Sequence, residues 1–159
     1  MSDMLVKLYE LKPENELLDR LGKDGITIKR ALAPDMSQIL DYVKDNFGDT
    51  WASECTVAFT NKPISCYIAV REKKLVGFSC YGATAKGFFG PIGVADELQG
   101  KGIGKALLHQ CLSSMRESGY AYAVIGGAGE DVYDFYSKSA GAVVIPGSDP
   151  GVYSQMVEN

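Results

Sequence analysis

Three glycines alternate with other residues in the segment 99–104, which reads Gln-Gly-Lys-Gly-Ile-Gly and lies between a strand-like run and a segment of helical periodicity. Glycine admits positive φ and lets a ligand approach the main chain closely. The first N–H groups of a helix have no partners within the helix and lie at the positive end of its dipole. We therefore expect this loop to bind an anion, most naturally a phosphate, with Lys101 and Lys105 adding positive charge.

Three kinds of phosphate-binding loop can be compared with this segment. The ATP-binding loop requires GxxxxGK followed by Ser or Thr, whereas Ala106 follows the Gly104-Lys105 pair here. The dinucleotide-binding fingerprint requires GxGxxG, and the three alternating glycines have the wrong spacing for it. The third pattern, [Gln/Arg]-x-x-Gly-x-[Gly/Ala], is matched in full by residues 99–104.

Together with residues 91–98 before it and 135–138 after it, this loop resembles that of the GNAT superfamily of N-acetyltransferases, over about residues 26–157. The resemblance implies acetyl-CoA as cosubstrate, with its pantetheine arm in an opening between the 88–94 and 120–125 strands. Pantetheine carries amides, which can pair with an exposed strand edge. The residues implied to contact the coenzyme are Ile92, Gly93, Val94, Gln99, Gly100, Lys101, Gly102, Ile103, Gly104 and Lys105.

Acetyl transfer to an amine requires a deprotonated nucleophile, a stabilised oxyanion and a protonated thiolate leaving group. An alkylamine has a pKa of about 10.4, so only roughly one molecule in a thousand is neutral at pH 7. By the resemblance, Tyr136 acts as the acid near the coenzyme sulfur, and the Val94 N–H binds the oxyanion. A phenol of pKa about 10 and a thiol of about 8.5 make this transfer mildly uphill. Alternatively Tyr136 only packs, since Tyr133 and Phe135 are its neighbours.

The chain departs from the family pattern at two places. After Tyr136, residues 137–142 read Ser-Lys-Ser-Ala-Gly-Ala, one residue longer than usual. The asparagine often found after the 120–125 strand is replaced by Gly-Gly-Ala-Gly at 126–129. We therefore expect one coenzyme contact to be lost or to be made by the main chain.

The candidates for the general base are Glu54, Asp96 and Glu97. Asp96 and Glu97 border the coenzyme loop, although both also fit a solvated turn, and Glu54 also fits a surface position on its helix. By the resemblance, the region of Glu54 lines the acceptor pocket. We expect Trp51 and Phe89 to wall this pocket, because aromatic faces attract cations. The expected acceptor is a small molecule that carries an amine, and the sequence does not name it.

The elements that position these residues follow from hydrophobic spacing. Strands are expected at residues 4–9, 26–29, 65–70, 75–81, 88–94, 120–125, 142–145 and 152–157, and helices at 15–21, 36–47, 50–59, 103–118 and 131–139. Thr50 is the expected helix cap, the 120–125 strand is expected to be buried on both faces, and the last two strands are expected to pair. This order predicts an α/β mixed sheet with helices on both faces. The resemblance implies a GNAT-like fold, a mostly antiparallel sheet with a β-α-β crossover at the coenzyme site.

Composition narrows the remaining possibilities. The 159 residues, 46% hydrophobic and 23% charged, suit one domain, with residues 1–25 as an extension that caps the pocket, extends the sheet or makes a homodimer contact. The net charge of −4, without basic clusters, argues against nucleic acid. Without a signal peptide or a long apolar run, we expect a cytoplasmic protein with no membrane partner.

Cysteine and histidine usage indicates no metal site. Cys55, Cys66, Cys80 and Cys111 are spaced too irregularly for a metal knuckle and are expected to be reduced core residues. His109 lies within a predicted helix and is expected to be structural. The favoured function is N-acetyl transfer from acetyl-CoA to a primary amine. A non-catalytic module that binds acyl-CoA is the alternative, and a dinucleotide oxidoreductase is a third possibility.

Overall fold

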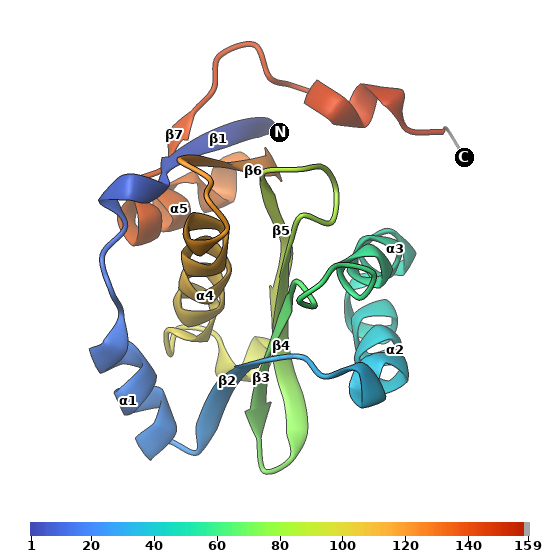
Figure 1. Ribbon diagram of the computed structural model, residues 1–159, viewed down its shortest axis with the longest axis vertical. Helices are drawn as coiled ribbons and strands as arrows, with labels where there is room; N and C mark the ends of the chain where they lie inside the picture. The colour runs from blue at the N-terminus through green and yellow to red at the C-terminus, as the bar shows by residue number, and fades with distance from the viewer. Residues whose placement is uncertain (158–159) are drawn as a thin grey trace.

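A computed structural model describes residues 1–157, in which one mixed sheet has the strand order β2-β3-β4-β5-β6-β1-β7 (Figure 1). Neighbouring strands are antiparallel except β5 and β6, which are parallel. The strands are β1 (Ser2–Lys7), β2 (Ile26–Arg30), β3 (Cys66–Arg71), β4 (Lys74–Tyr81), β5 (Phe88–Val94), β6 (Tyr122–Ala128) and β7 (Val143–Val144). The helices are α1 (Asn15–Lys23), α2 (Met36–Phe47), α3 (Asp49–Ala58), α4 (Ile103–Glu117) and α5 (Tyr133–Ala140). The expected fold class is confirmed.

Two layers of helices cover the sheet. α2 and α3 lie on one side, and α4 lies on the other side together with α1 and α5 (Figure 1). In α2 the apolar spacing buries Ile39 and Val43, and the helix ends at Gly48, whose φ of 101° favours glycine. Within residues 1–157, no helix is long and apolar enough to cross a membrane.

α4 is the crossover helix between the parallel strands β5 and β6, and it packs across β3, β4 and β5. Leu107, Cys111 and Met115 lie one turn apart and are buried, as their spacing predicted. Because α4 begins shortly after β5 ends, its N-terminus stands beside the end of that strand. The glycine loop is thereby placed at the end of β5, where Leu17 and Arg20 of α1 lie beside Gly102.

The two ends of the chain differ most from the expectation. Residues 1–25 extend the sheet, since β1 pairs with both β6 and β7. The expected pairing of 142–145 with 152–157 is wrong: only Val143 and Val144 form a strand, and they pair with β1. Residues 151–155 instead form the 3₁₀ helix η5 (Gly151–Gln155), in which Val152 is exposed. Apolar alternation there did not reflect a sheet, because η5 packs only part of its side chains inward.

Three smaller expectations are also corrected. Strand β1 ends at Lys7, and the 3₁₀ helix η1 (Leu8–Glu10) follows it. Thr50 is not a cap, because α3 begins at Asp49 after Gly48, without a side-chain cap hydrogen bond. Strand β6 alternates between buried and more exposed residues at its start, so it is not buried on both faces. One of its faces lies towards α4, and the other is partly open.

The four cysteines are buried and unpaired, as expected. The Sγ atoms of Cys55, Cys66 and Cys80 nevertheless lie within 4.8 Å of one another, which their spacing along the chain did not reveal. Cys66 and Cys80 are opposite each other on β3 and β4, and α3 supplies Cys55. Burial raises the pKa of Cys80 well above its usual range, so its thiol remains protonated at neutral pH.

Candidate coenzyme and acceptor site

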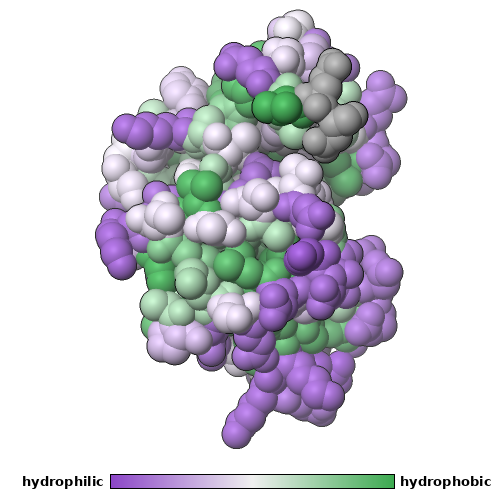
Figure 2. Space-filling model, turned by 90° about the vertical axis from the view of Figure 1, so that its right-hand side faces the viewer, coloured by the Kyte–Doolittle hydropathy of each residue, from purple (hydrophilic) through white to green (hydrophobic). Residues whose placement is uncertain are grey.

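A cavity of about 1020 Å³ runs along the ends of β5 and β6. Main-chain-rich segments line one end, from Leu98 to Lys105, and residues of α3 and η5 line the other. We call these the coenzyme end and the acceptor end. Figure 2 views the molecule from the side of α2 and α3 and shows apolar surface in the middle of this face, below the C-terminal segment.

The opening between β5 and β6 is present in the structure. The two strands pair only at Phe88 with Val124 and at Phe89 with Ile125. Further along β5, the Ala95 N–H donates to the Val76 carbonyl of β4. Consecutive residues of a strand direct their main-chain groups to alternate sides. The main-chain groups of Val94 and Ile92 therefore point away from β4, towards the opening.

The glycine loop has the conformation that its sequence suggested. Gly100 and Gly102 have φ values of 83° and 94°, and Gly102 is the N-cap residue of α4. The seven expected coenzyme-binding positions of the loop, residues 99–105, need no side chain for this role, because main-chain N–H groups at a helix start bind anions. All the expected coenzyme residues line the cavity except Lys101.

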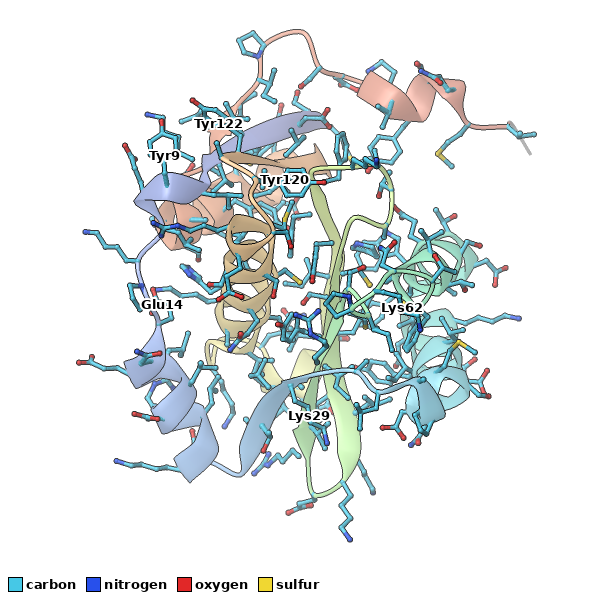
Figure 3. The ribbon with its side chains drawn as sticks, viewed as in Figure 1. Tyr9, Glu14, Lys29, Lys62, Tyr120 and Tyr122 are labelled. Atoms are coloured by element: carbon cyan, nitrogen blue, oxygen red, sulfur yellow. The ribbon has the colours of Figure 1, made fainter. Side chains whose placement is uncertain are left out.

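A residue that the sequence did not suggest adds positive charge at the loop. Lys101 is exposed, and its carbonyl accepts a hydrogen bond of 3.0 Å from the Arg20 Nη2 of α1. Lys105 forms an ion pair of 3.3 Å with Glu14, which lies between α1 and α4 (Figure 3). The guanidinium of Arg20 is thus beside the coenzyme loop. Arg20 belongs to residues 1–25. The sequence around it does not show that it contacts Lys101, which lies 81 positions further along the chain.

Aromatic side chains of α2 and α3 pack against β5, one of the two strands that border the opening. A Cβ at Gly93 would lie 2.5 Å from the Phe47 ring, so this ring rests directly on the main chain of β5. Trp51 stacks on Phe47 with ring centroids 5.6 Å apart and also meets Phe78 edge-on. Trp51 lines the cavity. One face of its indole is committed to packing, and the rest contributes to the cavity wall.

Tyr136 lines the cavity on α5 and is 7% exposed. It packs against Phe135 and, edge-on, against Phe89 at a centroid distance of 6.3 Å. Burial raises the pKa of Tyr136 to about 12. The phenol therefore remains protonated at neutral pH. Phe89 also lines the cavity but is 1% exposed, so it serves mainly as support for Tyr136.

The three candidate bases occupy different surroundings. Glu54 lines the cavity, and its Oε2 accepts a hydrogen bond from the Thr84 hydroxyl in the loop after β4. Asp96 and Glu97 are exposed in a short 3₁₀ turn, and neither lines the cavity. Asp96 instead accepts a hydrogen bond of 3.3 Å from the side chain of Gln99. Of the three carboxylates, only Glu54 faces the space in which an acceptor would bind.

His109 does not line this cavity. Its ring Nε2 lies 2.6 Å from the Ser139 carbonyl, which assigns the proton to Nε2 as the donor. This bond joins α4 to α5, the helix that carries Tyr136. The expectation of a structural histidine agrees with this contact.

The sequence did not suggest two further residues of the acceptor end, Tyr153 and Met156. Both line the cavity from the C-terminal segment. Glycines at 126 and 127 leave room for the Tyr153 ring, because a Cβ at Gly126 would lie 2.7 Å from its hydroxyl oxygen. An unusual glycine pair after a strand was the available signal, but it does not say which side chain fills the space.

Comparisons with known proteins agree with this geometry. A family model described as Acetyltransferase (GNAT) family matches residues 36–142, more than half of the chain. No curated protein matches the chain significantly.

Three solved structures illustrate the likeness in fold. A GCN5-related glucosamine N-acetyltransferase region of a fungal multi-domain GH3 beta-N-acetylglucosaminidase has a TM-score of 0.72 at 15% identity, covering 91% of this chain and 19% of that one. A GCN5-related N-acetyltransferase from Sphaerobacter thermophilus has a TM-score of 0.68 at 21% identity, covering 91% and 48%. A GNAT family acetyltransferase from Brucella melitensis, in complex with acetyl-CoA, has a TM-score of 0.52 at 19% identity, covering 69% and 80%. The chain thus spans less than half of the first two structures.

Proposed function

Because the chain belongs to the GNAT acetyltransferase family, we propose that it transfers an acetyl group from acetyl-CoA to a primary amine of a small molecule by direct attack. The observation that carries this proposal is the parting of β5 and β6 beside a glycine loop at a helix N-terminus. A thioester cosubstrate with a pyrophosphate and an amide-bearing arm matches both features. The family uses acetyl-CoA for this purpose.

At the coenzyme end, the pyrophosphate would bind the main-chain N–H groups from Gly100 to Lys105. Arg20 would add positive charge beside the loop. The pantetheine amides would pair with the main chain of Ile92 and Val94, which is directed into the opening. This pairing would place the thioester beside β5, in the cavity that both Val94 and Tyr136 line.

At the acceptor end, Glu54 would take the proton of the acceptor ammonium. The neutral nitrogen would then attack the thioester carbon, and the Val94 N–H would stabilise the oxyanion. When the tetrahedral intermediate collapses, the C–S bond breaks and the products are the acetylated amine and coenzyme A. Glu54 would release the first proton to solvent and then take the second proton from the nitrogen, and the leaving thiolate would take a proton from solvent.

We propose a narrower role for Tyr136 than the acid that the resemblance implies. Burial raises its pKa to about 12, which makes full transfer of its proton to the leaving sulfur less favourable than transfer from a free phenol. We therefore assign to Tyr136 a hydrogen bond to the leaving sulfur. Such a bond stabilises developing negative charge while the phenol keeps its proton.

Two measurements test the proposal. Thermal denaturation with acetyl-CoA, NAD and ATP should show a stabilising shift with acetyl-CoA, because a ligand that binds only the native state stabilises it. Thiol release from acetyl-CoA should then be measured with ethanolamine, butylamine, 1,4-diaminobutane and glucosamine. A shift with acetyl-CoA but no thiol release with any amine would favour the non-catalytic module. A shift with NAD alone would overturn the assignment of the coenzyme.

A further inference from the structure

The C-terminal segment 145–157 lies against the acceptor end of the cavity. Strand β7 leads into it, and η5 with the residue that follows it brings Tyr153 and Met156 into the cavity wall. The region that matches the family model ends at residue 142. This part of the wall is therefore built by residues outside the family-matched region, where acceptor preference can be particular to this chain.

The Tyr153 ring packs on β6 over Gly126 and Gly127, two residues that we call its seat. A Cβ at Gly126 would lie 2.7 Å from the Tyr153 hydroxyl oxygen, and a Cβ at Gly127 would lie 3.0 Å from the ring. Gly127 also has a φ of 61°, which disfavours other residues. Any side chain at these two positions would displace the ring from the cavity wall.

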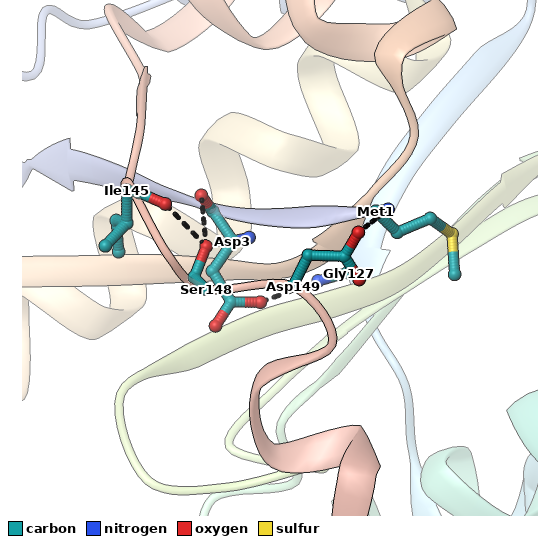
Figure 4. Close-up of polar contacts among 6 residues, drawn as sticks. All are labelled: Met1, Asp3, Gly127, Ile145, Ser148 and Asp149. Atoms are coloured by element: carbon teal, nitrogen blue, oxygen red, sulfur yellow. Dashed lines mark hydrogen bonds and ion pairs between the residues drawn. The ribbon is translucent and has the colours of Figure 1, made fainter.

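Hydrogen bonds to Asp3 hold the segment that precedes η5 (Figure 4). The Asp3 N–H donates to the Ser148 Oγ at 2.8 Å, and the Ser148 hydroxyl donates to the Ile145 carbonyl at 2.6 Å. The Asp3 carboxylate accepts a hydrogen bond of 2.9 Å from the Gly127 N–H. Asp3 is 7% exposed, so these bonds are shielded from water. One residue of β1 thus fixes both the seat on β6 and the segment that carries the tyrosine.

Three side-chain oxygens converge where this segment faces α3. The Thr84 hydroxyl donates to the Glu54 carboxylate. The Tyr153 phenol lines the same cavity: burial raises its pKa, the negative charge of Glu54 raises it further, and Thr84 opposes the rise. All three residues are partly buried and line the cavity. Within residues 1–157, no lysine, arginine or histidine nitrogen and no amino terminus lies within 4.0 Å of a Glu54 oxygen.

We propose that Glu54, Thr84 and Tyr153 form one binding site for the primary ammonium group of the acceptor, with Tyr153 as a specificity-determining residue. This inference rests on the proposed function. A primary ammonium has three N–H donors and no acceptor. The site offers it a carboxylate oxygen and the lone pairs of two hydroxyl oxygens, and within residues 1–157 no cationic group lies within 4.0 Å of the Glu54 carboxylate. A tertiary ammonium keeps one N–H and matches only one of these oxygens.

The test uses whichever panel amine gives the fastest thiol release. Its KM should rise about tenfold in Tyr153→Phe and in Thr84→Val, the loss expected for one hydrogen bond to a charged group. Tyr153→Phe keeps the ring in its seat, so the stabilising shift with acetyl-CoA should be unchanged. Tyr9→Phe, which alters an exposed tyrosine far from the cavity, is the matched control. The N,N-dimethyl analogue of the amine, tested as a competitive inhibitor, should bind at least tenfold more weakly than the amine.

The outcomes separate this inference from the proposed function. Raised KM in both variants, with coenzyme binding and the Tyr9→Phe control unchanged, would support the three-oxygen site. Unchanged KM in an active protein would overturn the site and leave acetyl transfer intact, because Tyr153 would then only pack. Equal binding of the dimethyl analogue would also overturn it. No thiol release with any amine would overturn both proposals.

Discussion

The two ends of the cavity differ in the groups that line them, main-chain groups at one end and side chains at the other. At the coenzyme end, the proposed binding groups are mainly main-chain atoms of two nearby segments, residues 92–94 and 99–105. At the acceptor end, they are side chains from three separate elements, with Glu54 on α3, Thr84 after β4 and Tyr153 on η5. The main-chain groups of the first end lie within the family-matched region, whereas Tyr153 of the second end lies beyond it.

This difference separates binding of the shared cosubstrate from selection of one acceptor. Main-chain groups bind the part of a cosubstrate that all reactions of one type share, and they tolerate many side chains. Side-chain oxygens and rings select one acceptor among many, and their positions depend on long-range packing. The coenzyme end should therefore respond to changes in backbone conformation, and the acceptor end to the loss of single polar atoms.

The largest expected effect is at the coenzyme end. Acetyl-CoA at 100 times its Kd would stabilise the native state by about 2.7 kcal/mol, and Gly102→Val should lose most of this gain. Gly102 has a φ of 94°, and its Cβ would lie 2.8 Å from Leu17 and 2.9 Å from Arg20. Thermal denaturation with and without acetyl-CoA measures the loss.

Gly119→Val controls for strain alone, because Gly119 has a φ of 100° and open space around it. It should lower the melting temperature yet keep the shift with acetyl-CoA. If both variants keep the shift, the anion does not bind at the loop. Gly104→Ala should also keep it, since the added Cβ makes only ordinary contact, 3.5 Å, with Phe135.

The second largest effect, on kcat, is expected at Tyr136, which lies between the two ends of the cavity. Tyr136→Phe should lower kcat by about 10- to 100-fold, because it removes a hydrogen bond to developing charge on sulfur. Affinity for acetyl-CoA should stay within a few-fold, since the ring still packs on Phe89. Tyr133→Phe, on the same helix but not lining the cavity, is the control.

The pH dependence sharpens this assignment. The pKa of Tyr136 is raised to about 12, so the phenol keeps its proton until well above the ordinary value. The wild-type rate should therefore rise with the fraction of neutral amine and should not fall through ionisation of Tyr136 below about pH 10. A decline in rate that begins near pH 8 and disappears in Tyr136→Phe would contradict the raised pKa.

How far the sequence predicts each end follows from the same distinction. The loop 99–104 could be interpreted locally, because glycine spacing and the following helix determine where its N–H groups point. Tyr153 could not, since its role depends on Gly126 and on Asp3, more than a hundred residues away. The sequence even suggested a strand at 152–157, because apolar alternation does not distinguish a sheet from a short 3₁₀ helix with a few inward side chains.

A third prediction tests the acceptor end through its charge. Glu54→Gln should raise KM for the preferred amine by about tenfold or more and leave acetyl-CoA binding unchanged, because a charged partner is lost from a partly buried site. Trp51→Ala should also raise KM, although it disturbs the stack on Phe47 as well. Glu97→Gln is the control, since Glu97 is exposed and outside the cavity. If Glu97→Gln lowers the rate and Glu54→Gln does not, the base lies on the coenzyme side.

The smallest effect should come from the residues that hold the acceptor end without touching the acceptor. Ser148→Ala removes the bonds to Asp3 and Ile145, which should cost about 1 kcal/mol of unfolding free energy. Because these bonds position the segment that carries Tyr153, KM for the amine should rise by about two- to threefold, a fraction of one hydrogen bond. Ser154→Ala is the matched control, since its hydroxyl bonds only within η5, to Gly151. Steady-state kinetics of the two variants would decide the point: equal KM values would mean that the Asp3 contacts stabilise the chain without shaping the site.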